Sequence, residues 1–564
     1  MKTRLALAAA TVAMVALAPT APTRAQGLAG PYLAGVSASY DNDYAAAARF
    51  FAEAAERDPD NINLLQDTAI NAVIAGDFDT ALPVASKLQD LGADVQLSGL
   101  ILIADAMGRQ DYAGALAVLE SAGDEVNPLL GNLLRGWIEA GLGDIDAATQ
   151  TLQSVSGDTA FGALAKYHQS LILGLVGNFD GAVSILEGDA ETGPLRVNRA
   201  SARVHAQMLM QLDRKDDALA VIGTALEEEP DLELFDLRES IQSGQDVSFD
   251  HVRSVEDGAG EVLLTLASAL GPESFALFYG RLAQIVRPDY VEAYLFTADL
   301  FSTKEQYALA VADYEKIPAE SIDYRSARIG RANAFADAGD AEGAIAAMSA
   351  ITEEWPDDGY ALISLGDLYR YEERFEEATA TYTQALGLVE RPRPGDWRTH
   401  YVRGISYERT DNWEAAEADF RKALELRPDQ PLVLNYLGYS LVEMDMKIDE
   451  ARDMIERAVA GDPDNGYITD SLGWVLYKIG EYDAAVPHME RAAELLPSDP
   501  IINDHLGDVY WTVGRKTEAV FQWKRALSFG PEEAEADRIR RKLDVGLDVV
   551  RAEEAEAEAA STQN

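Results

Sequence analysis

Alanine recurs along this chain at a spacing close to 34 residues, and this period constrains the fold more than any other feature. The successive spacings are 34, 34, 33, 34, 36, 58, 34, 34, 34, 38, 35, 34 and 34 residues. A fixed period of this length is typical of a solenoid in which one helical hairpin is stacked many times. The alanines in phase are Ala47, Ala81, Ala115, Ala148, Ala182, Ala218, Ala276, Ala310, Ala344, Ala378, Ala416, Ala451, Ala485 and Ala519.

Each period contains two apolar stripes at helical spacing, which predicts two amphipathic helices. A small residue stands at the eighth position of most periods, opposite the alanine, where it would let the two helices cross closely. The sequence therefore predicts an all-α protein, a right-handed α-solenoid of stacked antiparallel helix pairs with about 14 repeats. The eighth-position glycines are Gly35, Gly136, Gly366, Gly404, Gly438, Gly473 and Gly507.

The repeat resembles the tetratricopeptide repeat. Leu472-Gly473, Tyr510, Ala485, Ala492 and Pro497 stand at the small, aromatic and proline positions of that family. The resemblance implies an array whose first helices line a concave face that binds other proteins.

Three carboxy-terminal segments, 434–441, 470–477 and 505–508, are similar to bacterial cell-envelope tetratricopeptide proteins. These include outer-membrane lipoprotein adaptors that bring a carboxy-terminal processing protease to cell-wall hydrolases. The resemblance implies a non-catalytic scaffold in the periplasm. The chain has no cysteine, however, so we expect no lipid anchor, no disulfide and no thiolate metal site.

The first 25 residues read as an export signal. Lys2 and Arg4 precede an apolar run over 5–17, and Thr23-Arg24-Ala25 forms a small-x-small cleavage site. We therefore expect secretion and a periplasmic location. The formal net charge of −49 disfavours nucleic acid and anionic lipid as partners and is also typical of a simple solvated acidic surface.

The period predicts the organisation of the chain. We expect an amino-terminal arm at 28–232, a degenerate repeat at 257–290 and a carboxy-terminal arm at 291–531, then a capping helix at 532–550 and an acidic disordered tail at 551–564. The 58-residue spacing predicts an insertion at 233–256, interpreted as a joint between the arms.

Catalytic and metal-binding patterns are not evident. The six histidines fall in different repeats without the i, i+4 pairing of a zinc helix, and neither a Walker loop nor a Gly-x-Ser-x-Gly elbow is present. We expect no enzyme activity and no cofactor or metal.

In this repeat, positions 2, 5, 9 and 12 of the first helix point into the groove. In the last repeats of the chain these positions form an aromatic and acidic strip, which would suit an extended basic or mixed peptide. Aromatics at this spacing equally fit packing between hairpins. The candidate binding residues are Tyr401, Asn435, Tyr439, Tyr467, Asp470, Trp474, Tyr477, Asp504, Asp508 and Trp511.

The leading hypothesis is a scaffold that binds envelope proteins, such as a protease or cell-wall enzyme, in its concave groove. Alternatives are a chaperone-like binder of unfolded exported chains and an enzyme with a site in the central segment at 233–288. Self-association through terminal hairpins is a further hypothesis.

Overall fold

The computed structural model describes residues 27–93, 95–155, 160–188, 195, 200–228, 232–271 and 274–561. Over these residues it contains 31 α-helices, two short 3₁₀ helices and no strand. The export signal expected at 1–25 lies outside the described residues. No helix in the described part has the length and apolar character needed to cross a bilayer.

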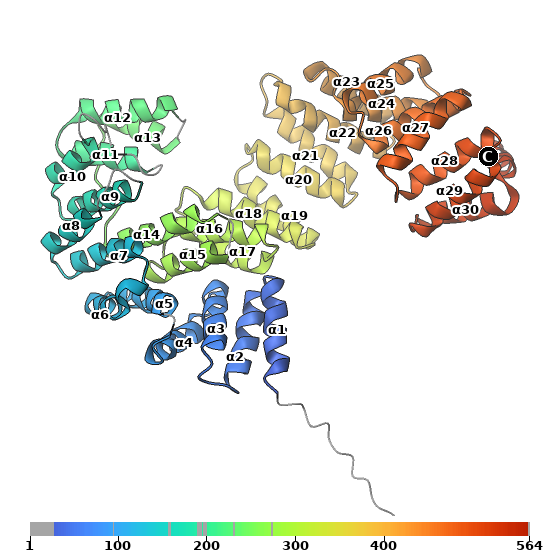
Figure 1. Cartoon of the computed structure of the whole chain (residues 1–564). Helices are drawn as coiled ribbons and strands as arrows, with labels where there is room; N and C mark the ends of the chain where they lie inside the picture. The colour runs from blue at the N-terminus through green and yellow to red at the C-terminus, as the bar shows by residue number, and fades with distance from the viewer. Residues whose placement is uncertain are drawn as a thin grey trace, which may run out of the picture. The chain divides into compact units, whose positions relative to one another are not determined.

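The chain divides into two compact units, Met1–Gly339 and Asp340–Asn564. The first unit contains α1 (Ala29–Tyr40), α2 (Tyr44–Ala55), α3 (Ile62–Ala75), α4 (Phe78–Asp90), α5 (Val95–Gly108), α6 (Tyr112–Ala122), α7 (Pro128–Gly141), α8 (Ile145–Ser154), α9 (Ala160–Leu175), α10 (Phe179–Glu187), α11 (Ser201–Gln211), α12 (Lys215–Glu228), α13 (Leu232–Ser243), α14 (Val255–Ala269), α15 (Ser274–Val286), α16 (Val291–Thr303), α17 (Tyr307–Tyr314) and α18 (Tyr324–Asp337) (Figure 1).

The second unit begins with α19 (Ala341–Glu354). It continues with α20 (Gly359–Tyr371), α21 (Phe375–Gly387), α22 (Trp397–Arg409), α23 (Trp413–Leu426), α24 (Pro431–Glu443), α25 (Ile448–Gly461), α26 (Gly466–Lys478), α27 (Tyr482–Leu495), α28 (Pro500–Thr512), α29 (Lys516–Ser528), α30 (Glu533–Val545) and α31 (Leu547–Ser561).

The helices pair as the period predicts, and the all-α solenoid of antiparallel hairpins is confirmed. All fourteen phased alanines lie on the second helix of their period, and each is 0% exposed. Many second helices begin after an Asp or Asn whose side chain accepts a hydrogen bond from the backbone, as Asp43 does from Ala46 and Asp340 from Gly343. This cap ends the short turn between the two helices and fixes where the second helix starts.

The eighth-position glycines make room for a large side chain of the paired helix. A Cβ at Gly507 would lie 2.5 Å from Trp523, and one at Gly366 would lie 2.5 Å from Tyr382. The side chain that fills each space comes four residues after the phased alanine, so both small residues are needed for the close crossing. The pairs are Gly35–Phe51, Gly136–Leu152, Gly366–Tyr382, Gly404–Phe420, Gly438–Ile455, Gly473–Met489 and Gly507–Trp523.

The hairpin α14–α15 occupies the first-helix face of the first unit. α14 contacts α7 and α9, and α15 contacts α3 and α5, all of which are first helices of their repeats. The approach is close, because a Cβ at Gly258 would lie 2.0 Å from the Trp137 ring, and a Cβ at Gly108 would lie 2.4 Å from the Ile285 carbonyl oxygen. The segment that the sequence identified as a degenerate repeat therefore covers the inside of the preceding repeats.

Two boundaries differ from the sequence-based expectation. Much of the segment 233–256, expected to be a joint, forms α13 at Leu232–Ser243, and the compact units instead divide between Gly339 and Asp340. The tail expected to be disordered from 551 continues α31 as far as Ser561. Its alanine and glutamate residues favour a helix, and Arg538 and Arg541 of α30 pair with Glu554 and Glu553.

Candidate functional site

The ten candidate binding residues all lie on the first helices α22, α24, α26 and α28 of the second unit, but the structure uses most of them for packing. Tyr467 is 59% exposed, whereas Asp470, Tyr477 and Asp508 are buried. The half-buried members of the set are Tyr401, Asn435, Tyr439, Trp474, Asp504 and Trp511.

Trp474 is held in an aromatic stack between neighbouring first helices. The centre of its ring lies 3.9 Å from that of the His505 ring, with 16° between the ring planes. It lies 5.0 Å from the centre of the Tyr477 ring, with 29° between the planes. The Trp474 indole N–H donates to Glu443 at 2.9 Å, and His505 Nδ1 lies 3.0 Å from Asp470. Although burial disfavours the charged imidazole, Asp470 raises the pKa of His505. These contacts join α24, α26 and α28 and explain the positions of both Asp470 and Trp474.

The acidic end of the strip is neutralised by the chain itself. Lys542 of α30, whose side chain is 0% exposed, places Nζ 2.7 Å from both Asp504 and Asp508. The Trp523 indole N–H donates to Asp508 at 2.9 Å. Burial and the neighbouring Asp508 raise the pKa of Asp504. The basic group predicted to come from a partner is therefore supplied by the capping helix.

α31 covers the aromatic end of the same strip. The Arg551 guanidinium lies 4.8 Å from the centre of the Tyr477 ring, and the Trp511 indole N–H donates to Asp548 at 3.0 Å. Gly546, between α30 and α31, lies against Trp511 where a Cβ would approach within 2.6 Å. Tyr477 and Trp511 are thus internal contacts of the carboxy-terminal cap.

The remaining candidates lie in the middle of the second unit. The Tyr401 ring packs against Trp397, Phe420 and Tyr436, with centroids about 6 Å apart. Tyr439 is half-buried, and burial raises its pKa. Asn435 has a buried side-chain oxygen without a hydrogen-bond partner among the described residues.

Four exposed apolar side chains lie on the first helices α20, α24, α26 and α28, and Tyr467 is the member that also belongs to the ten candidates. Each residue occupies the second position of a first helix: Tyr360 is 62% exposed, Leu432 45%, Tyr467 59% and Ile501 46%. We call these four residues the exposed row. The rule for groove positions includes position 2, so applying it to every repeat would have found Tyr360, Leu432 and Ile501.

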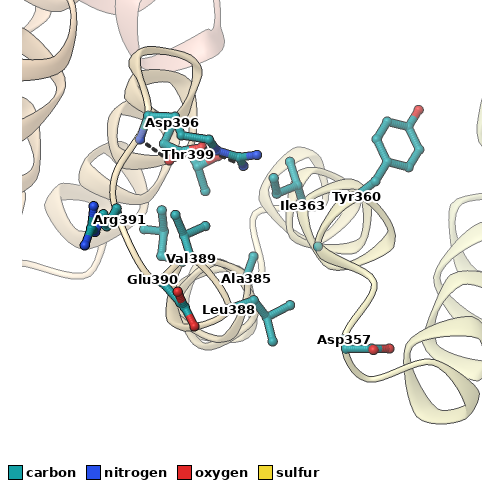
Figure 2. Close-up of a pocket in the computed structure, with 13 residues that line it drawn as sticks. Asp357, Tyr360, Ile363, Ala385, Leu388, Val389, Glu390, Arg391, Asp396 and Thr399 are labelled. Atoms are coloured by element: carbon teal, nitrogen blue, oxygen red, sulfur yellow. Dashed lines mark hydrogen bonds and ion pairs between the residues drawn. The ribbon is translucent and has the colours of Figure 1, made fainter. Parts of the chain in front are cut away.

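A cavity of about 530 Å³ opens beside the first residue of this row. Figure 2 shows it between α20 and α21 on one side and the segment that leads into α22 on the other. Ile363, Ala385, Leu388 and Val389 supply apolar lining. The cavity lies at the Pro-rich insertion at 391–395, which widens the spacing between two repeats.

The segment beside the cavity is basic in an otherwise acidic chain. Residues 391–409 contain five arginines and two acidic residues, against a net charge of −49 for the whole chain. Arg393 at the rim pairs with Asp396 at 3.2 Å. Arg391 and Arg398 are exposed and have no ion-pair partner among the described residues. The cavity itself is lined by the two arginines Arg391 and Arg393 and by the carboxylates of Asp357, Glu390 and Asp396.

The central segment, where an enzyme site was an alternative, holds a cluster of polar side chains. Arg203 NH2 donates to His251 Nδ1 at 2.9 Å, so the other imidazole nitrogen, Nε2, carries the hydrogen that faces Glu261 at 3.0 Å. Tyr167 also donates to Glu261, at 3.0 Å. Although burial favours its protonated form, these hydrogen bonds hold the pKa of Glu261 at about 2.

These bonds tie α14 to α9 and α11 and explain the cluster as a connection between helices. A cavity of about 410 Å³ adjoins it. No group of His, Asp or Glu in the described part of the chain has the arrangement needed to hold a metal ion.

Comparison with known proteins supports tetratricopeptide repeats in the second unit. Residues 363–431 and 446–500 match the family model described as tetratricopeptide repeat. A tetratricopeptide repeat-containing protein of Pseudomonas aeruginosa is 33% identical over 98 residues, which are 17% of this chain and 17% of that protein. The match thus spans a small part of the relative's length.

Solved structures with similar helical arrays cover more of the chain at lower identity. A chain of the APC/C hetero-tetramer Cut9–Hcn1 is 17% identical, covers 92% of this chain and 96% of its own length, and has a TM-score of 0.38. A tetratricopeptide repeat protein from Parabacteroides merdae is 18% identical, covers 46% of this chain and 98% of its own length, and also has a TM-score of 0.38.

Proposed function

We propose that this chain is a periplasmic scaffold that binds segments of other cell-envelope proteins along the first helices of its second unit. The exposed row carries the proposal. It places one large apolar side chain at the second position of four first helices, three of which, α24, α26 and α28, belong to consecutive repeats, and a contiguous exposed apolar surface marks an interaction site. Tetratricopeptide repeats generally serve protein–protein interaction, which agrees with this use.

The cavity beside Tyr360 indicates what a partner segment would contain. Its apolar lining suits an aliphatic side chain, and Arg391, which lines the cavity and has no ion-pair partner among the described residues, suits a carboxylate near that side chain. The acidic end of the strip, by contrast, is already paired with Lys542. A segment that combines aliphatic and acidic residues therefore fits this surface better than the basic peptide suggested by the sequence.

The location and the class of partner are supported by the sequence. The export signal expected at 1–25 supports a periplasmic location, and the segments that resemble envelope adaptors favour a protease or cell-wall enzyme as a partner. Two proteins held on one scaffold would meet at a raised effective concentration. Fractionation of cells that express the full chain, with detection of the shortened mature form in the periplasm, tests the location.

Site-specific photo-crosslinking tests the binding surface. A crosslinker replaces Leu432 in one variant and Phe521, which is 67% exposed on α29, in the other. We expect a defined set of envelope proteins to crosslink from position 432 and not from position 521. The triple variant Y360S/L432S/Y467S should lose these partners in affinity capture. A matched triple variant at exposed apolar positions elsewhere, F161S/I322S/F521S, should retain them.

Three results would separate the alternatives. Partners captured equally by both triple variants would contradict the proposed surface. Capture of many unrelated unfolded chains, without a defined set, would favour a chaperone-like binder. A defined set that is lost with the exposed row would support the scaffold.

A further inference from the structure

Helix α1 carries several apolar side chains that the described residues of the first unit leave exposed. Leu28, Tyr32, Leu33, Val36 and Tyr40 are 37%, 41%, 64%, 42% and 88% exposed. Leu33, Val36 and Tyr40 are three and four residues apart, which places them on one side of α1, whereas Tyr32 and Gly35 lie against Phe51 of α2. In a stacked array a neighbouring hairpin would cover such a face.

This surface differs in charge from the rest of the chain. Residues 27–40 contain no charged side chain, whereas the complete chain has 96 acidic and 47 basic residues. Two copies with a net charge of −49 repel each other, and contact is least unfavourable where both surfaces are neutral and apolar. The α1 face satisfies this condition for a second copy of the same chain.

The carboxy-terminal end of the second unit is covered and polar. α30 and α31 cover the last hairpin, and the ion pairs Arg538–Glu554 and Arg541–Glu553 lie on their surface. Stacking α1 of one copy on these helices would remove charged groups from water without new partners, which is costly. Contact of α1 with α1 of a second copy has no such cost and closes as a symmetric dimer.

We infer that two copies of this chain associate through their α1 faces, with α1 packed against α1 across a two-fold axis. The contact involves one short helix from each copy, so it buries less than the roughly 1,600 Å² of a standard interface. The dimer is therefore weak and concentration-dependent. Salt strengthens it, because screening reduces the repulsion between two acidic chains.

Sedimentation velocity measures this association directly. The purified chain, with its mass checked for loss of the first 25 residues, is examined from about 1 to 100 μM in low and in about 0.5 M NaCl, the range over which a contact of this size forms. We expect a dimer fraction that rises with both concentration and salt. The variant L33E/V36E should weaken dimerisation at least about tenfold. Because both residues are exposed, its helicity should remain unchanged, and F521E on α29 should dimerise normally.

The absence of cysteine gives an independent test of geometry. A single cysteine at Ser37, which is exposed beside the apolar face of α1, should form a disulfide-linked dimer under mild oxidation. The matched variant S528C, at an exposed serine on α29, should not. A chain that stays monomeric at the highest concentration and salt would overturn the inference, as would a dimer that is insensitive to L33E/V36E. These results are independent of whether the exposed row binds a partner.

Discussion

Arg281 of α15 donates a hydrogen bond of 3.0 Å from Nε to the backbone carbonyl of Ile74 in α3, across 207 residues of sequence. The same guanidinium pairs with Asp313 at 2.7 Å, and the two side chains are 6% and 4% exposed. One buried cation therefore joins the beginning of the first unit to α15 and α17. This connection makes the hairpin of α14 and α15, which covers the first helices of the preceding repeats, an integral part of the first unit.

Loss of this cation should strongly destabilise the first unit. We expect R281M to lower its free energy of unfolding by about 3–5 kcal/mol, because Asp313 is left buried without a counter-charge. Burial already raises the pKa of Asp313 with Arg281 present. The loss should therefore be smaller at pH 5 than at pH 8, where the carboxylate must remain charged. Urea unfolding at both pH values measures this, and the exposed R253M serves as the control.

Docking of α14 on α7 should fail when Gly258 gains a side chain. We expect G258A to increase hydrogen exchange in α14 and α15, since its Cβ would lie 2.0 Å from the Trp137 ring. The matched variant G223A lies in α12 with open space around its Cβ, and should stabilise that helix by up to about 1 kcal/mol. Unchanged exchange in G258A would show that α14 is not held against Trp137.

Acid should destabilise the first unit through two histidines. Burial lowers the pKa of His168 and of His205 to about 4, from an ordinary value of 6.5. Between these values the unfolded chain takes up a proton that the folded chain does not, so stability falls as the pH decreases from about 6.5 to 4. Each histidine should account for about 2–3 kcal/mol.

Trp137 reports this change, because it is the one tryptophan in residues 1–339. Its signal can be followed by fluorine NMR of fluorotryptophan-labelled protein during urea unfolding, with W137F used for assignment. The variant H168N keeps an acceptor for the Trp137 N–H, which donates to His168 Nδ1 at 3.2 Å, and should reduce the pH dependence. A pH dependence equal to that of the unmodified chain would contradict the role of His168.

Removing the charge of Lys542 should release the carboxy-terminal cap. In K542M, Asp504 and Asp508 would lose their buried cation, and docking of α30 and α31 should weaken by about 3–5 kcal/mol. Faster hydrogen exchange confined to these helices is the expected result. The exposed K524M should leave exchange unchanged. Release of α31 would also uncover Tyr477 and Trp511, so partner capture by K542M tests whether the covered strip can bind.

The hairpins could be predicted from sequence because their determinants are local. Ala519 and Gly507 are separated by twelve residues and fix the crossing of α28 and α29, with Trp523 filling the space that the glycine leaves. The same pairing of a glycine with a large side chain occurs in seven periods. Its prediction required no knowledge of contacts between distant segments.

The arrangement of α14 and α15 could not be predicted in the same way. The 58-residue spacing indicated an insertion, but the docking of Gly258 on Trp137 depends on helices more than 100 residues apart. The pairing of Lys542 with the acidic strip could not be predicted either. A lysine is rarely fully buried, so Lys542 would be expected at the surface. The exposed row needed only the repeat position, and Tyr467 was found by that rule.

The α14–α15 hairpin also determines when the first unit can complete its folding during synthesis. During synthesis, α3, α5, α7 and α9 are complete before α14 and α15 exist, so their inner face stays open until residue 286 has been made. Closing a loop of this length is slow, because distant segments must meet before their contacts stabilise the chain. Most contacts of the second unit join neighbouring helices and can form one hairpin at a time. The first unit is therefore the part of the nascent chain that depends longest on protection from aggregation.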